Sequence, residues 1–127
     1  MRNILLPHTL DDLWEILYSE PGPHVYAGGT DLLVKLRSLS PSSLLSSAPR
    51  CPDPLTVQLF RPPAPLVCLE RIEELKGVYE EDRLVCIRAC TTHTEIMNDP
   101  VVRRHFPVLP GALRLLGSPQ IRNMGTI

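Results

Sequence analysis

The stretch VYAGGTDLLV, residues 25–34, contains the residue types best suited to binding an anion. Two adjacent glycines precede a threonine and an aspartate. Glycine adopts positive φ and lacks a Cβ, so successive backbone N–H groups in such a turn can surround a phosphate. A helix after the turn would add the positive end of its dipole, and the Thr30 hydroxyl could donate another hydrogen bond. The order strand, glycine turn and helix therefore indicates one possible phosphate cradle.

The same residues also fit a plain tight turn in which Asp31 only caps the following helix. The spacing is neither the G-x-G-x-x-G dinucleotide fingerprint nor the G-x-x-x-x-G-K-[ST] phosphate loop. Lys35 lies about one helical turn beyond Asp31, and no lysine follows the glycines directly. On spacing alone, the anion site and the structural turn both remain open.

The other reactive side chains form no catalytic pattern. The four histidines are scattered, and we expect an ordinary surface role for His93 in the first turn of a helix. The acidic residues 73–74 and 80–82 are interpreted as solvated charges, the first pair in a helical turn and the second group in a hairpin loop. No Ser–His–Asp or Cys–His arrangement stands out, so we assign no catalytic residue.

The cysteines show no C-x-x-C spacing, which argues against zinc or iron–sulfur ligation by this chain alone. Cys86 lies in an apolar, strand-like run and is expected to behave as a small hydrophobic residue. Reduced thiols in a cytoplasmic protein are favoured over a disulfide framework. The four cysteines are Cys51, Cys68, Cys86 and Cys90.

Length and composition indicate one modest globular domain. The chain has 127 residues, with 43% hydrophobic and 21% charged residues and a net charge of −1. Nucleic-acid binding and anionic membrane surfaces reward a clear basic excess, which is absent here. The apolar run near the amino terminus is too short for a secretory signal, and no run approaches the ~20 residues of a membrane span.

Periodic apolar residues predict the elements around the glycine turn. Thr9 and Asp12 resemble a capping box, and a helical face follows, formed by Leu10, Leu13, Trp14 and Leu17. Pro21–Pro23 end this helix. A short buried strand over 25–27 precedes the glycine turn, and a helix over 31–37 follows it. This alternation is typical of an α/β or α+β domain.

Residues 38–65 break the pattern, since seven of these 28 residues are proline and six are serine. This composition predicts an exposed, partly disordered loop, with a proline-rich ligand segment as the alternative.

Order returns with a buried strand over 66–69. A second strand over 84–89 is expected to pair with the segment before a turn at 80–82 as a hairpin. Thr92 and Glu95 form a T-x-x-E capping box for a short helix. Helical structure is then expected over 101–106 and 109–116, ending at 117–119.

Three segments, VYAGGTDLLVKLR, ACTTHTEI and GSPQIRNMGTI, resemble in order and spacing the FAD-binding subunit or domain of molybdenum hydroxylases. This group includes the medium subunits of xanthine dehydrogenase and carbon monoxide dehydrogenase. The intervening LVCLERIEELKGV is similar to the strand-then-turn segment of the family, and SPQIRNMGTI is the most specific motif. The resemblance covers nearly the whole chain outside 38–65, where this sequence carries a longer loop.

The resemblance implies an α+β fold of the PCMH type, also found in vanillyl-alcohol oxidase-like flavoproteins, with FAD between two subdomains. The glycine loop would wrap the FAD pyrophosphate with its N–H groups, and the stretch that opens with Thr126 would supply a second contact. The cofactor-binding residues implied in this way are Val25, Tyr26, Ala27, Gly28, Gly29, Thr30, Asp31, Leu32, Thr126 and Ile127.

The implied function is electron transfer from iron–sulfur clusters through FAD to an acceptor such as NAD⁺ or a quinone. The iron–sulfur clusters and the molybdenum cofactor would reside on partner subunits, an iron–sulfur subunit and a molybdopterin-binding subunit.

In the family the last motif runs directly into Gly-Gly-Asn, whereas this sequence stops at Ile127. We therefore expect residues 1–127 to be the amino-terminal part of the domain, with the first subdomain complete and the second truncated. The isolated chain is expected to bind FAD weakly or not at all. The alternatives are a non-catalytic module that docks on partner subunits, or an inactive remnant.

Overall fold

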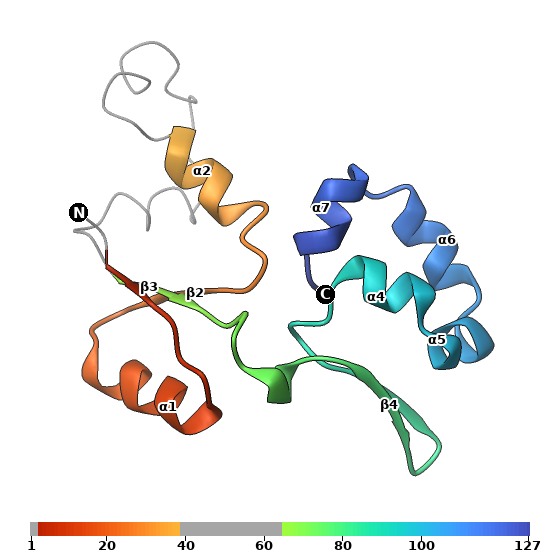
Figure 1. Ribbon diagram of the computed structural model, residues 1–127, viewed down its shortest axis with the longest axis horizontal. Helices are drawn as coiled ribbons and strands as arrows, with labels where there is room; N and C mark the ends of the chain where they lie inside the picture. Colours follow the sequence, from red (N-terminus) through yellow and green to blue (C-terminus); the bar gives the residue numbers. More distant parts are fainter. Residues whose placement is uncertain (1–2, 39–64) are drawn as a thin grey trace.

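The computed structural model describes residues 3–38 and 65–127. Figure 1 shows two lobes: an amino-terminal lobe, residues 3–38 and 65–75, and a carboxy-terminal lobe, residues 76–127. The first is built on a parallel sheet, and the second on a hairpin and short helices. The loop and ligand-segment interpretations of 38–65 fall, except for its two end residues, outside the described residues.

A three-stranded parallel sheet organises the amino-terminal lobe. Its order is β1 (Ile4–Leu5), β3 (Leu66–Cys68) and β2 (His24–Tyr26). All three residues of β3 are buried, as expected for an uninterrupted apolar run in the centre of a parallel sheet. The strands expected at 25–27 and 66–69 are confirmed to within one residue, but the expected burial of the first is wrong, because β2 is an edge strand and Val25 is 43% exposed. β1 was not anticipated, because two residues carry no periodicity.

Helix α1 (Leu10–Ser19) packs on one face of this sheet and confirms the predicted helix. The Thr9 hydroxyl accepts from the Asp12 N–H, and the Asp12 carboxylate accepts from the Thr9 N–H, each at 3.1 Å. Leu13 forms the core of the lobe with Val67 and Ile72. Trp14 was expected on the buried face but is 55% exposed and lies against the Tyr18 ring.

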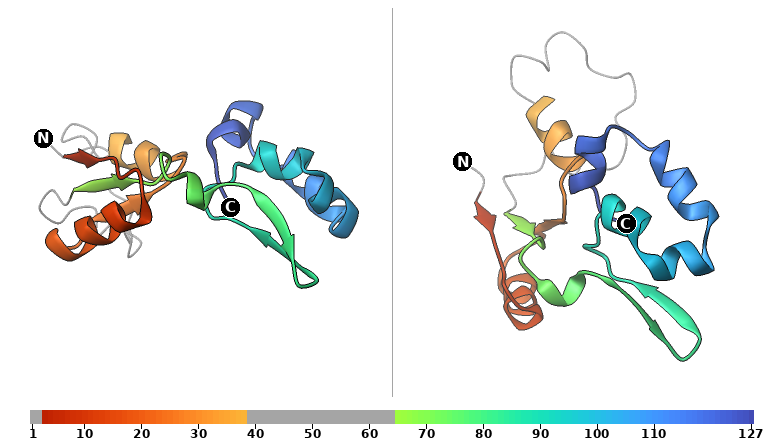
Figure 2. Two further views of the ribbon diagram at one scale, coloured as in Figure 1. Left: turned by 60° about the horizontal axis from the view of Figure 1, so that its bottom comes forward. Right: turned by 45° about the vertical axis from the view of Figure 1, so that its right-hand side comes forward.

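The predicted helix after the glycine turn is α2 (Leu32–Ser38). Figures 1 and 2 show α2 and α1 on opposite sides of the sheet. The ladder continues past the end of the strands, because the Leu69 N–H donates to the Tyr26 carbonyl at 2.8 Å. The chain therefore leaves β2 at a fixed point, and the glycine turn starts there.

A 3₁₀ helix, η1 (Glu73–Leu75), leads into the hairpin of β4 (Val78–Glu81) and β5 (Leu84–Ile87). The turn consists of Asp82 and Arg83, both at positive φ, a pattern that matches the twist of a two-residue hairpin. The predicted turn at 80–82 was therefore wrong by about two residues. Glu80 lies in the ladder and forms an ion pair with Arg104, so it is not merely a solvated loop charge.

Four short helices complete the described part of the carboxy-terminal lobe: α4 (His93–Asn98), α5 (Pro100–His105), α6 (Val108–Arg114) and α7 (Pro119–Met124). Their core consists of Ile96, Val102 and Leu113. The capping box at Thr92 and the helical segments near 101–106 and 109–116 are confirmed.

Helix α7 was not predicted. It is six residues long and is started by Ser118, whose hydroxyl accepts from the Ile121 N–H, and by Pro119 in its first turn. Within 3–38 and 65–127, no helix has the length and apolar character needed to cross a membrane.

Candidate functional site

The glycine turn lies at the carboxyl end of β2, the edge of a parallel sheet at which ligands commonly bind. Gly29 has φ +65°, and its carbonyl accepts from the Leu33 N–H at 3.1 Å, so it sets the start of α2. The Asp31 carboxylate forms an ion pair with the Lys35 ammonium at 2.8 Å. The acidic charge nearest to the turn is therefore balanced by a basic group on the same helix.

The backbone N–H groups of residues 27–32 donate no hydrogen bond to any group of the chain that the structure describes. Backbone donors are normally paired with protein groups or with water. The first N–H groups of a helix lack an intrahelical acceptor in any case, and here the run extends back through both glycines. The turn thus presents a continuous series of donors that can bind an anion.

The peptide between Met124 and Gly125 lies against Gly28. A Cβ built on Gly28 would overlap the Met124 carbonyl oxygen and come within 3.1 Å of the Gly125 nitrogen. On Gly125, a Cβ would lie 3.2 Å from Cε1 of His93. Both glycines are therefore needed for close packing of the chain on itself. Gly28 is not explained by access for a ligand alone.

Hydrogen bonds join the segment 91–94 to the end of the chain. The His93 N–H donates to the Gly125 carbonyl at 2.9 Å, and the Ile127 N–H donates to the Thr91 carbonyl at 3.3 Å. Thr92 and Thr126 form an antiparallel bridge. The structure thus brings the TTH and MGTI motifs together, and MGTI also contacts the glycine turn.

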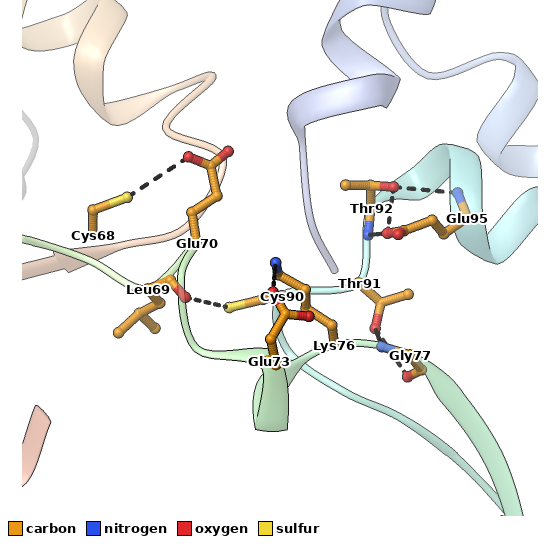
Figure 3. A network of polar contacts seen from close by, with 10 residues as sticks. All are labelled: Cys68, Leu69, Glu70, Glu73, Lys76, Gly77, Cys90, Thr91, Thr92 and Glu95. Carbon is orange, nitrogen blue, oxygen red and sulfur yellow. Dashed lines mark hydrogen bonds and ion pairs between the residues drawn. The ribbon is translucent and has the colours of Figure 1, made fainter. Parts of the chain in front are cut away.

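A second set of contacts holds Cys90 and Thr91 against the segment 69–77 (Figure 3). The Thr91 hydroxyl accepts from the Gly77 N–H at 2.9 Å and donates to its carbonyl at 3.0 Å. The Cys90 thiol donates to the Leu69 carbonyl at 3.8 Å. The Thr91–Gly77 bonds lie within the carboxy-terminal lobe, and the Cys90–Leu69 bond links the two lobes close to the point at which β3 ends.

The side chains beside the turn are held in neutral forms. Burial, followed by a hydrogen bond with the Cys68 thiol, raises the pKa of Tyr26 to about 12. Burial also raises the pKa of the Cys90 thiol, which disfavours a nucleophilic thiolate. Among the residues that the structure describes, no group of three or more His, Cys, Asp or Glu side chains could hold a metal ion.

His93 differs from the sequence-based expectation of an ordinary surface role. Its ring lies against Gly125, and its Nδ1 is buried without a hydrogen-bond partner. Asn123 was also missed, although its amide oxygen accepts from the Thr94 hydroxyl at 2.6 Å. Both residues lie inside the motifs quoted for the family resemblance, which is the signal that could have marked them.

The ten residues expected to bind the cofactor fall into two segments, 25–32 and 126–127. The contact of Gly28 with Met124 and Gly125 places these segments next to each other. Val25 is largely exposed on the edge strand, whereas Tyr26 is half-buried. Their direct contacts with a cofactor stay predictions.

Comparison with known families identifies the relationship. The family described as "FAD binding domain in molybdopterin dehydrogenase" matches residues 54–127, more than half of the chain. The chain belongs to this family. The match covers the second part of this chain, which includes the TTH and MGTI motifs, and leaves the glycine turn outside it.

Curated relatives of this FAD-binding domain extend the likeness to the glycine turn. The nicotinate dehydrogenase FAD-subunit of Eubacterium barkeri is 30% identical over 123 residues, which is 95% of this chain and 35% of that protein. The carbon monoxide dehydrogenase medium chain of Hydrogenophaga pseudoflava is 38% identical over 74 residues, 58% of this chain and 26% of that protein. The chain thus spans about a third or less of the length of these relatives.

Solved structures confirm the expected α+β FAD-binding fold. Quinoline 2-oxidoreductase from Pseudomonas putida 86 superposes with a TM-score of 0.74 at 25% identity, covering 99% of this chain and 37% of that one. Carbon monoxide dehydrogenase from Hydrogenophaga pseudoflava gives a TM-score of 0.73 at 27% identity, covering 98% and 37%. The expected division into two subdomains stays a prediction.

Proposed function

We propose that this chain is part of the FAD-binding, electron-transfer component of an oxidoreductase of the molybdenum hydroxylase type. The observation that carries the proposal is the unpaired series of N–H groups at residues 27–32, placed beside the segment 124–127. A diphosphate is an anion that such a series can bind without a lysine. Names of relatives such as "FAD-subunit" and "medium chain" support the same function.

The residues present fit FAD in three respects. The donors at 27–32 have no competing acceptor within the described chain. Asp31, which would repel a diphosphate, is paired with Lys35. The segment that begins at Thr126 lies on the other side of the Gly28 contact and can supply a second set of backbone groups. All three features are present in the chain without a bound cofactor.

When bound, FAD would supply the redox chemistry, accepting and donating electrons. The residues of this chain bind and orient it: the N–H groups of 27–32 would hold the diphosphate, and 126–127 would fix its position. We assign no side chain a general acid or base role. The neutral Tyr26 side chain beside the turn adds no negative charge that would repel the anion.

We further propose that the component works with an iron–sulfur subunit and a molybdopterin-binding subunit, and passes electrons to an acceptor such as NAD⁺ or a quinone. Several relatives are named as subunits or chains of dehydrogenases, and one solved relative is described as lacking the Mo-pyranopterin moiety of its molybdenum cofactor. Free thiols at Cys68, Cys86 and Cys90 support a reducing compartment such as the cytoplasm.

The test is a titration of the ¹⁵N-labelled chain with FAD, with inorganic pyrophosphate and with riboflavin, followed through backbone amide shifts. Amide shifts detect weak binding as well as tight binding. We expect FAD and pyrophosphate to move the amides of 27–32, and FAD also to move those of 124–127. Riboflavin, which lacks the diphosphate, should leave 27–32 in place. Amides of 27–32 that stay in place with both FAD and pyrophosphate would rule out this function for the turn.

A further inference from the structure

We propose that Thr94 and Asn123 are positioning residues for the cofactor, because their hydrogen bond sets the 124–127 segment against the glycine turn. This inference rests on the proposed FAD-binding function. The Thr94 hydroxyl donates to the Asn123 amide oxygen at 2.6 Å. Neither residue belongs to the two segments expected to contact FAD, so both would act through the segments that they hold.

The bond joins the start of α4 to the end of α7, next to the peptide that contacts Gly28. Thr94 lies in the first turn of α4, and Asn123 lies in the last turn of α7, one residue before the Met124 carbonyl that fills the space beside Gly28. The α7 helix ends immediately afterwards, where the Gly125 N–H donates to the Ile121 carbonyl. A rotation of the last turn of α7 would therefore move the Met124 carbonyl away from the glycine turn.

No other side chain–side chain hydrogen bond joins 91–98 to 118–127 in the described part of the chain. The other printed bonds between these segments, His93 to Gly125 and Ile127 to Thr91, are between backbone groups. The start of α7 is held by the Arg122 guanidinium, which donates to the carbonyls of Arg114, Leu116 and Gly117 at 3.3, 3.0 and 2.9 Å. The Thr94–Asn123 bond is the side chain–side chain hydrogen bond that fixes the last turn of α7 against α4.

The orientation matters for binding because the two proposed anion-binding segments lie on different lobes. Gly28 belongs to the amino-terminal lobe, and Met124 to the carboxy-terminal lobe (Figure 1). A ligand that contacts both needs them at a fixed separation, and disordering one side lowers affinity by the cost of ordering it again. Loss of this bond should therefore raise the dissociation constant for FAD more than it lowers the free energy of unfolding, since neither side chain is fully buried.

The experiment uses the full chain and measures the FAD dissociation constant by amide titration for Thr94→Val, Thr94→Ser, Asn123→Leu and the double variant Thr94→Val with Asn123→Leu. Thr94→Ser keeps the hydroxyl. Ser19→Ala, which removes an exposed hydroxyl bonded to Ile16, is the matched control. Urea unfolding without FAD and the unbound amide shift of Gly28 are recorded for each variant.

We expect Thr94→Val and Asn123→Leu each to raise Kd roughly three- to tenfold, the range that one net hydrogen bond provides. The double variant should be no weaker than the weaker single variant, and Thr94→Ser and Ser19→Ala should match the wild type. The Gly28 amide should shift in both single variants and in the double variant, but not in Thr94→Ser or Ser19→Ala. Additive effects, or equal Kd for Thr94→Val and Thr94→Ser, would overturn the positioning role. Pyrophosphate that leaves the amides of 27–32 of the wild-type chain in place would instead refute the proposed function of the turn.

Discussion

The carbonyl of Met124 occupies the space that a side chain at Gly28 would need. Two motifs that are far apart in the sequence therefore meet through their backbones, without any side chain between them. On the other side of the same peptide, the ring of His93 lies against Gly125. The two glycines of the turn thus have separate roles: Gly28 permits a contact between lobes, and Gly29 supplies the positive φ that starts α2.

Gly28→Ala should lower the free energy of unfolding by about 1–3 kcal/mol, the usual cost of overpacking a site that cannot relax. The clashing group is a backbone carbonyl, which a change of rotamer cannot move. Urea unfolding followed by circular dichroism measures the change. FAD binding should also weaken, because separating the two lobes moves the proposed second contact.

The matched control is Gly111→Ala. Gly111 lies in α6, where an added Cβ meets nothing within 4 Å. Alanine is the better helix former, so this variant should gain up to about 1 kcal/mol. A Gly28→Ala protein as stable as Gly111→Ala would show that the lobes do not pack through residue 28.

Local patterns were sufficient to predict most elements near the site. The capping boxes at Thr9 and Thr92 carry their own start signal, and the run at 66–69 is long and apolar enough to mark a buried strand. The glycine turn was also located correctly between strand and helix. These predictions succeed because each depends on residues within a few positions of one another.

Long-range contacts could not be predicted in this way. A side chain at Gly28 would meet a carbonyl at residue 124, and one at Gly125 would meet the ring at residue 93 as well as the nearby Ile121 carbonyl. Neither contact has a sequence period. The same limit applies to β1, whose two residues are strand only because β3 lies beside them. The family resemblance assigned the segments 25–32 and 126–127 to one site, which composition and periodicity could not do.

Gly29→Ala should also destabilise the protein, by about 1–2 kcal/mol for the left-handed conformation alone. Its φ is +65°, and a Cβ would come within 2.7 Å of Cδ1 of Leu33. Gly22→Ala is the comparison: Gly22 has nearly the same φ, +63°, but open space around it. Unfolding experiments should therefore give a larger loss for Gly29→Ala. An equal loss would mean that Leu33 simply moves aside.

Tyr26 should make stability depend on alkaline pH. Burial and the hydrogen bond with Cys68 raise its pKa from 10.0 to about 12, so the folded state favours the neutral phenol. The unfolded chain ionises first as pH rises. The stabilising contribution is thus fully present below pH 10.0 and is lost between pH 10.0 and about 12.

The measurement is the unfolding free energy of wild type, Tyr26→Phe and Tyr18→Phe across this pH range. Tyr26→Phe should show a shallower decline than wild type. Tyr18 is 88% exposed, so Tyr18→Phe should follow the wild-type curve and serves as the control. Identical slopes for all three proteins would contradict a buried, hydrogen-bonded phenol at residue 26.

The last prediction concerns acid and the capping box that fixes 92–94 beside the end of the chain. The Thr92 hydroxyl and backbone N–H both donate to Oε2 of Glu95 at 2.7 Å. These bonds, the hydroxyl first, lower the pKa of Glu95 below its usual 4.5. The carboxylate therefore stabilises the folded state above pH 4.5, and this contribution is lost as pH falls through the folded-state pKa.

Glu95→Gln should remove that acid dependence, lowering stability at neutral pH while changing little in acid. Glu95 is exposed, so the effect should be small and should shrink at high salt. Asp12→Asn, which alters the equivalent box of α1, is the control for a general loss of capping. Only Glu95→Gln should also broaden the amide signals of 125–127, because only the box at Thr92 adjoins the bridge to Thr126. Equal broadening in both variants would contradict the claim that the capping box at Thr92 holds the segment 125–127 in place.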